Sequence, residues 1–76
     1  MKELLEFLAG ELVEDPASVV VTESHDDRGV LLTLKVAQGD MGKVIGRAGR
    51  TARAIRTVVR AAATRQGMGA HVDIVD

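Results

Sequence analysis

The sequence has no cysteine, no tryptophan and no tyrosine, and Phe7 is its only aromatic residue. The absence of cysteine excludes a disulfide framework, a catalytic thiolate and a cysteine-based zinc site. A long apolar run is also missing. The first residues, Met1-Lys2-Glu3, begin an acidic, amphipathic segment rather than a signal peptide or a membrane span. We therefore expect a cytoplasmic protein without disulfides.

Groups suited to catalysis or metal binding are equally scarce. His25 and His71 have no second ligand at metal-binding spacing, and we expect surface or structural roles for both. The adjacent Asp26 and Asp27 are typical of a turn rather than of paired catalytic carboxylates. The glycines around Lys43 match neither a nucleotide phosphate loop nor the dinucleotide fingerprint. No nucleophile stands in a recognisable pattern with a base, so the sequence predicts no enzyme, no metal site and no cofactor.

The 76 residues predict a single domain that spans residues 1–76. A domain of this size has a thin core and would gain stability from a dimer contact. Its charge is uneven: residues 1–40 carry three basic and nine acidic side chains (net −6), whereas residues 41–76 carry seven basic and two acidic ones (net +5). This asymmetry favours a polyanion as the partner of the second half. The alternative is that the charges only solvate two helices.

Hydrophobic periodicity predicts a helix and a hairpin in the first half. Asp15-Pro16 ends the helix, because a residue before proline avoids the helical region. The apolar stripe of this helix consists of Met1, Leu5, Leu8 and Leu12, with Leu4 beside them. Segments 18–23 and 30–36 are rich in β-branched residues and leucine and predict strands. The turn-rich connection over 24–29 is short enough to pair them as an antiparallel hairpin.

The second half predicts two helices and a strand. Asp40 is the expected N-cap of a short helix over 41–45, and a long helix follows over about 50–66. Segment 70–75 alternates as a strand does and follows a helical crossover, so we expect it to pair parallel with the strand over 30–36. The order is α-β-β-α-α-β. The expected fold class is α+β, a three-stranded mixed sheet with the helices on one face.

Between the two helices of the second half lies Gly46-Arg47-Ala48-Gly49. Glycine allows backbone angles and close approaches that a side chain blocks. The N-terminal end of the following helix attracts phosphate through its free N–H groups and the helix dipole. Arg47 and Arg50 add positive charge at this end. The pattern is typical of a loop that binds a nucleic-acid backbone, and the alternative is a tight turn between helices.

The long helix separates an apolar side from a basic side. Its apolar side contains Ala52, Ile55, Val58, Val59, Ala62 and Ala63. Its basic side contains Arg53, Arg56 and Arg60. A merely solvated arginine face would be interspersed with acidic residues, but none occurs from Met41 through Val72. Together with the glycine pair, this arrangement predicts nucleic-acid binding.

The motif Val44-Ile45-Gly46-x-x-Gly49-Arg50, with Ile55 six residues after the second glycine, resembles the signature of KH domains. The α-β-β-α-α-β order resembles the bacterial type II KH arrangement. Over essentially all 76 residues the chain resembles the KhpA family of small bacterial RNA-binding proteins. This resemblance implies that a GXXG loop, Gly46–Gly49, clamps about four nucleotides through their backbone.

The resemblance also implies a role for the neighbouring residues. Val44 and Ile45, with the start of the next helix, would line one wall of a base groove that faces the strand over 30–36. Lys43, Arg50 and Arg53 would contact phosphates. The complete expected RNA-binding set is Lys43, Val44, Ile45, Gly46, Arg47, Ala48, Gly49, Arg50 and Arg53. KH grooves recognise bases through aliphatic surfaces and polar edges. The lack of tryptophan and tyrosine therefore opposes only an RNA-recognition-motif sheet or an aromatic stacking platform.

The expected partner is single-stranded RNA, held weakly by one small groove and more tightly where a second KH unit adds avidity. The resemblance implies a homodimer or a heterodimer with a larger KhpB-like protein. It further implies a role as an RNA chaperone or post-transcriptional regulator. The alternative is a protein–protein dimerisation adaptor in which RNA binding is incidental and the acidic half faces a basic partner. The residues alone leave this choice open.

Overall fold

The structure is a computed structural model that describes residues 1–75. Its helices and strands are α1 (Lys2–Leu12), β1 (Val20–Asp26), β2 (Gly29–Lys35), α2 (Met41–Ile45), α3 (Arg50–Arg65) and β3 (Ala70–Val75). This order confirms the predicted α-β-β-α-α-β arrangement and the α+β fold class. Short 3-10 helices connect the larger elements over Pro16–Ser18, Gln38–Asp40 and Arg47–Gly49. Within the described residues, no helix has the length and apolarity needed to cross a membrane.

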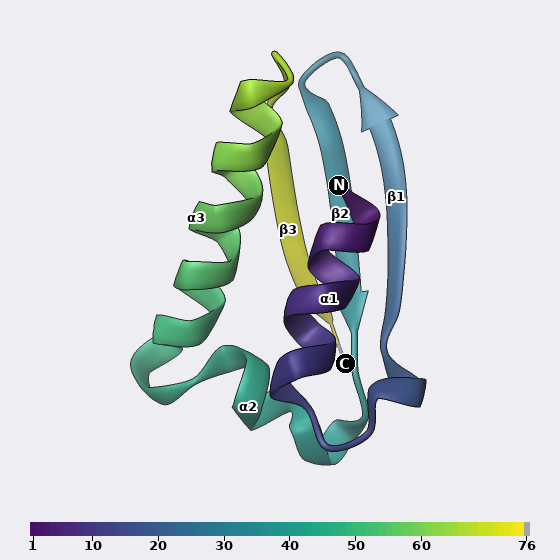
Figure 1. Ribbon diagram of the computed structural model, residues 1–76, viewed down its shortest axis with the longest axis vertical. Coiled ribbons are helices and arrows are strands. Elements are labelled where there is room, and N and C mark those ends of the chain that lie inside the picture. Colours follow the sequence, from purple (N-terminus) through teal and green to yellow (C-terminus); the bar gives the residue numbers. More distant parts are fainter. Residues whose placement is uncertain (76) are drawn as a thin grey trace.

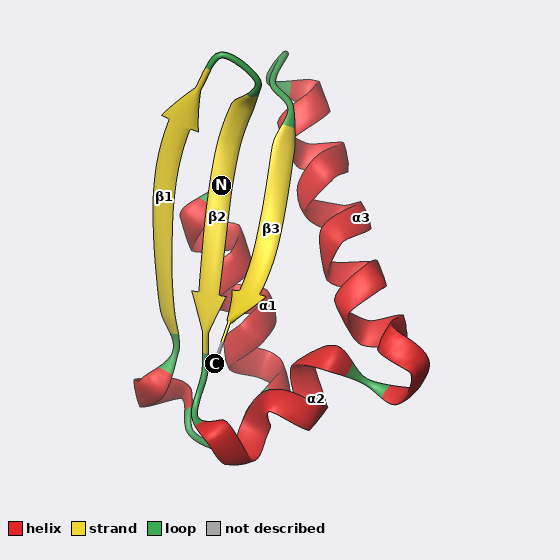
Figure 2. Cartoon of the chain, turned by 180° about the vertical axis from the view of Figure 1, so that it is seen from behind, coloured by secondary structure: helices red, strands yellow, loops and turns green. Residues whose placement is uncertain are grey.

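The sheet has β2 at its centre, antiparallel to β1 and parallel to β3. The register aligns Thr22 of β1 with Thr33 of β2 and with Asp73 of β3. α1 lies across one face of the sheet, α3 lies beside β3, and α2 lies near the end of β2 (Figure 1). Seen from behind, the other face of the sheet is uncovered over residues 1–75 (Figure 2). The parallel pairing of β2 with β3 confirms the expected mixed sheet.

The core forms where the inward side chains of the sheet meet the helices. It is centred on Val30, Leu32 and Leu34, alternate residues of β2 that point to the same face. The helices contribute Leu5 and Ala9 from α1, Val44 from α2, and Ile55, Val59 and Ala63 from α3. Because one core holds both α2 and α3, the loop between these helices is fixed at its two ends.

The β1–β2 hairpin is longer and tighter than predicted. β1 covers Val20–Asp26 instead of 18–23, β2 covers Gly29–Lys35 instead of 30–36, and the turn shrinks from 24–29 to two residues. The Asp26 carboxylate accepts a hydrogen bond from the N–H of Arg28 (2.7 Å) and so closes this turn. β1 is an edge strand whose only buried residue is Val21, so its polar side chains stay in solvent while its backbone pairs with β2. The prediction ended β1 too early because the last residues of this strand are polar.

Two predicted core positions lie at the surface. α1 ends at Leu12 because Val13 adopts an extended conformation (φ −94°, ψ 159°), so the helix stops before Asp15-Pro16. Leu12 is 38% exposed, although it belongs to the predicted apolar stripe of this helix. Val58, assigned to the apolar side of the long helix, is 45% exposed. Both residues therefore leave apolar surface outside the core.

Candidate nucleic-acid interface

The loop between α2 and α3 has an unusual backbone. Gly46 (φ 76°), Ala48 (φ 56°) and Gly49 (φ 74°) all have positive φ angles. A side chain at Gly46 would overlap the Oγ1 atom of Thr51, so only glycine fits there. Ala48 is the single non-glycine residue with a positive φ among residues 1–75, and this conformation costs an L-amino acid about 1–2 kcal/mol. The surrounding fold therefore holds the loop in a strained conformation, which is typical of binding loops.

The start of α3 lies directly beside this loop. The N–H of Gly49 donates to the carbonyl of Gly46 (3.1 Å) and the N–H of Arg50 donates to the carbonyl of Arg47, and α3 begins at Arg50 with no side-chain cap from any described residue. The first N–H groups of an uncapped helix remain available to water or to a ligand. Because α3 has 16 residues, its dipole adds a positive end at the same place. This end of α3 is suited to an anion such as phosphate.

Three exposed arginines surround the loop. Arg47 lies inside it, Arg50 begins α3, and Arg53 follows about one turn later. Within residues 1–75, no carboxylate lies at ion-pair distance from any of them. Their positive charge is uncompensated by the described part of the chain, and it lies where an anion would meet the N–H groups of α3.

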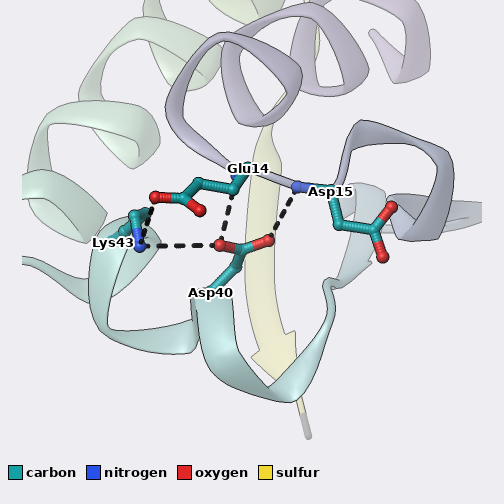
Figure 3. Close-up of polar contacts among 4 residues, drawn as sticks. All are labelled: Glu14, Asp15, Asp40 and Lys43. Atoms are coloured by element: carbon teal, nitrogen blue, oxygen red, sulfur yellow. Dashed lines mark hydrogen bonds and ion pairs between the residues drawn. The ribbon is translucent and has the colours of Figure 1, made fainter.

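Lys43, by contrast, already has two carboxylate partners. Its Nζ atom lies 3.7 Å from Oε1 of Glu14 and 3.7 Å from Oδ1 of Asp40 (Figure 3). These contacts link α2 to the segment that follows α1. Lys43 therefore lies close to the loop, but its charge is partly compensated, unlike that of the three arginines.

Asp40 has a role that the sequence did not predict. Only 4% of this residue is exposed, and it occupies the N-cap position of α2 without a capping hydrogen bond from its side chain. Its Oδ1 atom accepts the N–H of Glu14 (3.2 Å) and its Oδ2 atom accepts the N–H of Asp15 (3.1 Å) (Figure 3). The hydrogen bond from Glu14 is the main reason that the pKa of Asp40 is lowered; burial opposes this effect, and Asp15 and Lys43 add to it. The predicted N-cap position is confirmed, but the carboxylate does not cap α2, because main-chain donors distant in the sequence engage both of its oxygens.

The two apolar residues that precede the loop differ in exposure. Val44 is completely buried in the core, whereas Ile45 is half-buried. Val44 therefore supports α2 from inside the molecule, and Ile45 reaches the surface. The strand beside α3 is β3 (Figure 1). The strand over 30–36, which was expected to face the loop and the start of this helix, corresponds to β2 at the centre of the sheet. The strand that flanks the basic side of α3 is therefore β3.

Arg56 shows that the basic side of α3 faces β3. Its Nε atom donates to the carbonyl of Val72 in β3 (3.1 Å), and the residue is half-buried. Arg53 and Arg60, three residues before and four residues after, share this side of the helix and are exposed. The sequence grouped these three arginines, but gave no sign of the bond to β3. A row of positive charge therefore runs from the loop along α3.

The other flank of α3 faces α1 and is apolar. A shallow groove of about 260 Å³ lies between these helices, and its lining consists of Leu8, Glu11, Leu12, Thr51, Ala54, Ile55 and Val58. Nearby on α1, Phe7 is 63% exposed. Sequence reasoning missed this surface because it counted Leu12 and Val58 as core residues.

Comparison with known proteins finds similarity over nearly the whole length of the chain. The model of the KhpA/KhpB KH domain matches residues 2–74. Three similar proteins carry the name RNA-binding protein KhpA. The one from Clostridium acetobutylicum is 49% identical over 75 residues, which cover 99% of this chain and 100% of that protein. The one from Halalkalibacterium halodurans is 49% identical over 76 residues and 100% of both chains. The one from Streptomyces coelicolor is 47% identical over 76 residues, which are 100% of this chain and 92% of that protein. The chain thus belongs to the KhpA/KhpB family of KH domains.

Proposed function

We propose that this chain is a single-stranded RNA-binding domain that holds the RNA backbone at Gly46–Gly49. The similar proteins are named RNA-binding proteins, and the proposal adds the place and mode of binding. Its main support is the strained loop at the uncapped start of α3, surrounded by Arg47, Arg50 and Arg53. A phosphate at this place would meet main-chain N–H groups, the positive end of a helix dipole and arginine side chains together.

The other expected site residues differ in what their surroundings allow. Ile45 is half-buried and would give the groove an aliphatic wall, whereas Val44 would act only from the core. Lys43 would contact a phosphate only by leaving Glu14 and Asp40; with both contacts intact, it positions α2. The RNA would lie between the loop, the basic side of α3 and β3. Binding of this kind requires neither a metal nor an enzymatic activity.

A second copy of the chain would raise the affinity. One groove of this size neutralises few phosphates, so a single domain should bind weakly and with strong salt dependence. We place the contact between copies at the apolar groove, because Leu12 and Val58 are exposed there, away from the arginines. A homodimer, or a heterodimer with a KhpB-like protein, would present two RNA grooves and gain avidity. A single domain over 1–76 of this kind fits a cytoplasmic RNA chaperone or post-transcriptional regulator.

The apolar groove also supports a second candidate function, a dimerisation adaptor for which RNA binding is incidental. In that case the acidic first part of the chain, with a net charge of −6 over residues 1–40, would face a basic protein. The two candidates differ in the use of the loop, because an adaptor has no need of Gly46–Gly49.

Fluorescence-anisotropy titration of a labelled single-stranded RNA tests the proposal. The test variant combines Arg47→Asp with Ala48→Asp in the exposed loop, where aspartate tolerates the left-handed conformation of Ala48. The matched control combines Arg65→Asp with Gln66→Asp, which makes the same charge change at the exposed far end of α3. Each protein is measured at two salt concentrations, and circular-dichroism melting verifies that it folds.

We expect the wild type and the control to bind with an affinity that falls as salt rises. The loop variant should lose most of its affinity and keep its melting temperature, since the altered side chains lie in solvent. Equal binding by a folded loop variant would contradict the proposal. Absence of binding by the wild type at high micromolar concentration would also contradict it and would favour the adaptor.

A further inference from the structure

Arg56 differs from the other arginines of α3 in being held in place. Its Nε atom donates to the carbonyl of Val72 (3.1 Å), and its stem is half-buried between α3 and β3. Arg53 and Arg60, on the same side of the helix, are exposed and have no such partner among the described residues. The guanidinium of Arg56 is therefore pre-oriented, whereas those of its neighbours lack such a bond among the described residues.

The bond to Val72 leaves most of the guanidinium free. Arginine has five N–H donors, and the contact with β3 occupies only the one on Nε. The two terminal nitrogens keep their four hydrogens in the planar fork that suits two neighbouring acceptors. Within residues 1–75 no carboxylate forms an ion pair with Arg56. The molecule thus contains a fixed, half-buried and uncompensated fork beside β3.

The position of Arg56 relative to the loop suits a base rather than the clamped phosphate. Arg56 lies seven residues after Gly49, which is about 10 Å along the helix axis at 1.5 Å per residue. An RNA strand whose backbone lies at Gly46–Gly49 would therefore bring a nearby base to the side of α3 that faces β3, where Arg56 lies. In single-stranded RNA both polar edges of such a base are open to contact.

We propose that Arg56 is a specificity-determining residue that selects a base with two adjacent hydrogen-bond acceptors. Guanine offers O6 and N7 on its Hoogsteen edge, and cytosine offers N3 and O2 on its Watson–Crick edge. Adenine places the amino donor N6 beside its acceptors, and uracil places the N3–H donor between O2 and O4, so neither accepts both arms of the fork. This selectivity rests on the proposed function, because it requires an RNA strand held at the loop.

Four hexamer RNAs test the selectivity: all-uracil, and the same sequence with guanine, cytosine or adenine at the two central positions. The test variant is Arg56→Lys, which keeps the positive charge on a single donor nitrogen but removes the planar fork. The matched control is Arg53→Lys, the same change on the same side of α3 at an exposed position. Arg56→Gln is a second variant that keeps a donor within reach of Val72 without the charge. Melting curves verify the fold of each protein.

We expect the wild type to prefer the guanine or the cytosine hexamer over the other two by about tenfold. Arg56→Lys and Arg56→Gln should reduce this preference to within about twofold, whereas Arg53→Lys should keep it. A guanine preference would indicate the Hoogsteen edge and a cytosine preference the Watson–Crick edge, and either supports the inference.

Equal binding of all four hexamers by the wild type would overturn the inference, as would a preference that survives in folded Arg56→Lys. Arg56 would then only connect α3 to β3. Failure of the proposed function would give a different result. The wild type would then bind no hexamer, or the loop variant with Arg47→Asp and Ala48→Asp would bind every hexamer as well as the wild type does.

Discussion

The two flanks of α3 offer opposite kinds of surface to a partner. The flank toward β3 carries Arg53, Arg56 and Arg60, and it continues into the loop at the start of the helix. The flank toward α1 carries the exposed Val58 and forms the apolar groove with residues of α1. One helix therefore separates a surface suited to a polyanion from a surface suited to an apolar protein partner.

The rotation of α3 about its axis produces this separation. Intervals of three and four residues keep the three arginines on one side of the helix. Val58 lies two residues from both Arg56 and Arg60, which places it roughly 160° around the helix from each of them. The buried Ile55 and Val59 fix that rotation, because they face the sheet. The core therefore decides which partner each flank meets.

Replacement of the buried residue between the two flanks should have the largest effect. Ile55→Asp places an unpaired carboxylate in the core, at a cost of about 3–5 kcal/mol, which is comparable with the total stability of about 5 kcal/mol expected for a small domain. We expect loss of the cooperative melting transition and of both surfaces together. Ile55→Val, the control, should cost only about 1 kcal/mol. A native circular-dichroism spectrum with an unchanged melting temperature in Ile55→Asp would contradict the assignment of Ile55 to the core.

A charge on the apolar flank should abolish that surface alone. Val58→Asp puts a carboxylate at a position that is 45% exposed, so the domain should stay folded but lose the contact between copies. Sedimentation should show a monomer, and affinity for an RNA with two binding segments should fall roughly a hundredfold through loss of avidity. Ala61→Asp, an exposed position outside the groove, is the control and should stay dimeric. A dimer that survives in Val58→Asp would place the contact elsewhere.

Loss of one charge on the basic flank should have a smaller and uniform effect. Arg53→Gln removes one expected phosphate contact, so RNA affinity should fall by a similar factor for every sequence. The slope of log K against log salt should decrease by about 0.7 for a single strand. Titrations at three or more salt concentrations measure this slope. Arg28→Gln in the hairpin turn is the control; if it lowered the slope equally, the contact would not be specific to α3.

Asp40 lies outside both flanks and should show the smallest effect. Because its pKa is lower in the folded chain than its ordinary value of 3.8, the ionised carboxylate stabilises the fold above that pH. This contribution disappears as the pH falls through the folded-state pKa. Melting curves at pH 7 should place Asp40→Asn a few degrees below the wild type, and the difference should shrink toward pH 3. Asp27→Asn, in the exposed turn, is the control and should melt as the wild type does. If Asp40→Asn also melted as the wild type does at each pH, the carboxylate of Asp40 would contribute nothing to stability.

Patterns local in the sequence predicted most of the fold. The order of the elements and the mixed sheet follow from periodicity and from the handedness of crossovers, and the structure confirms both. The buried face of α3 was also predicted correctly at Ile55 and Val59. The RNA-binding assignment of Gly46–Gly49 stays a prediction, and the glycine-rich loop at a helix start is the local signal on which it depends.

Features that depend on contacts between distant residues were not predictable. Asp40 accepts hydrogen bonds from the N–H groups of residues 26 and 25 positions away, and its place at the N-cap of α2 gave no sign of these contacts. Arg56 finds its acceptor in Val72, 16 residues later. Lys43 was expected to contact phosphate, and its carboxylate partner Glu14 lies far away in the sequence, in the segment that follows α1. A helical wheel gives the direction of a side chain but not the extent of the core, which explains the exposure of Val58.

Backbone amide chemical shifts distinguish the two flanks most directly. Protein labelled with ¹⁵N is titrated with a short single-stranded RNA, and the shift of each amide is followed. RNA binding at the basic flank should give the largest changes over Gly46–Gly49, in Arg53 and Arg56, and in β3 near Val72, with little change at Leu12 and Val58. Changes centred on the groove between α1 and α3, with the loop unaffected, would contradict it.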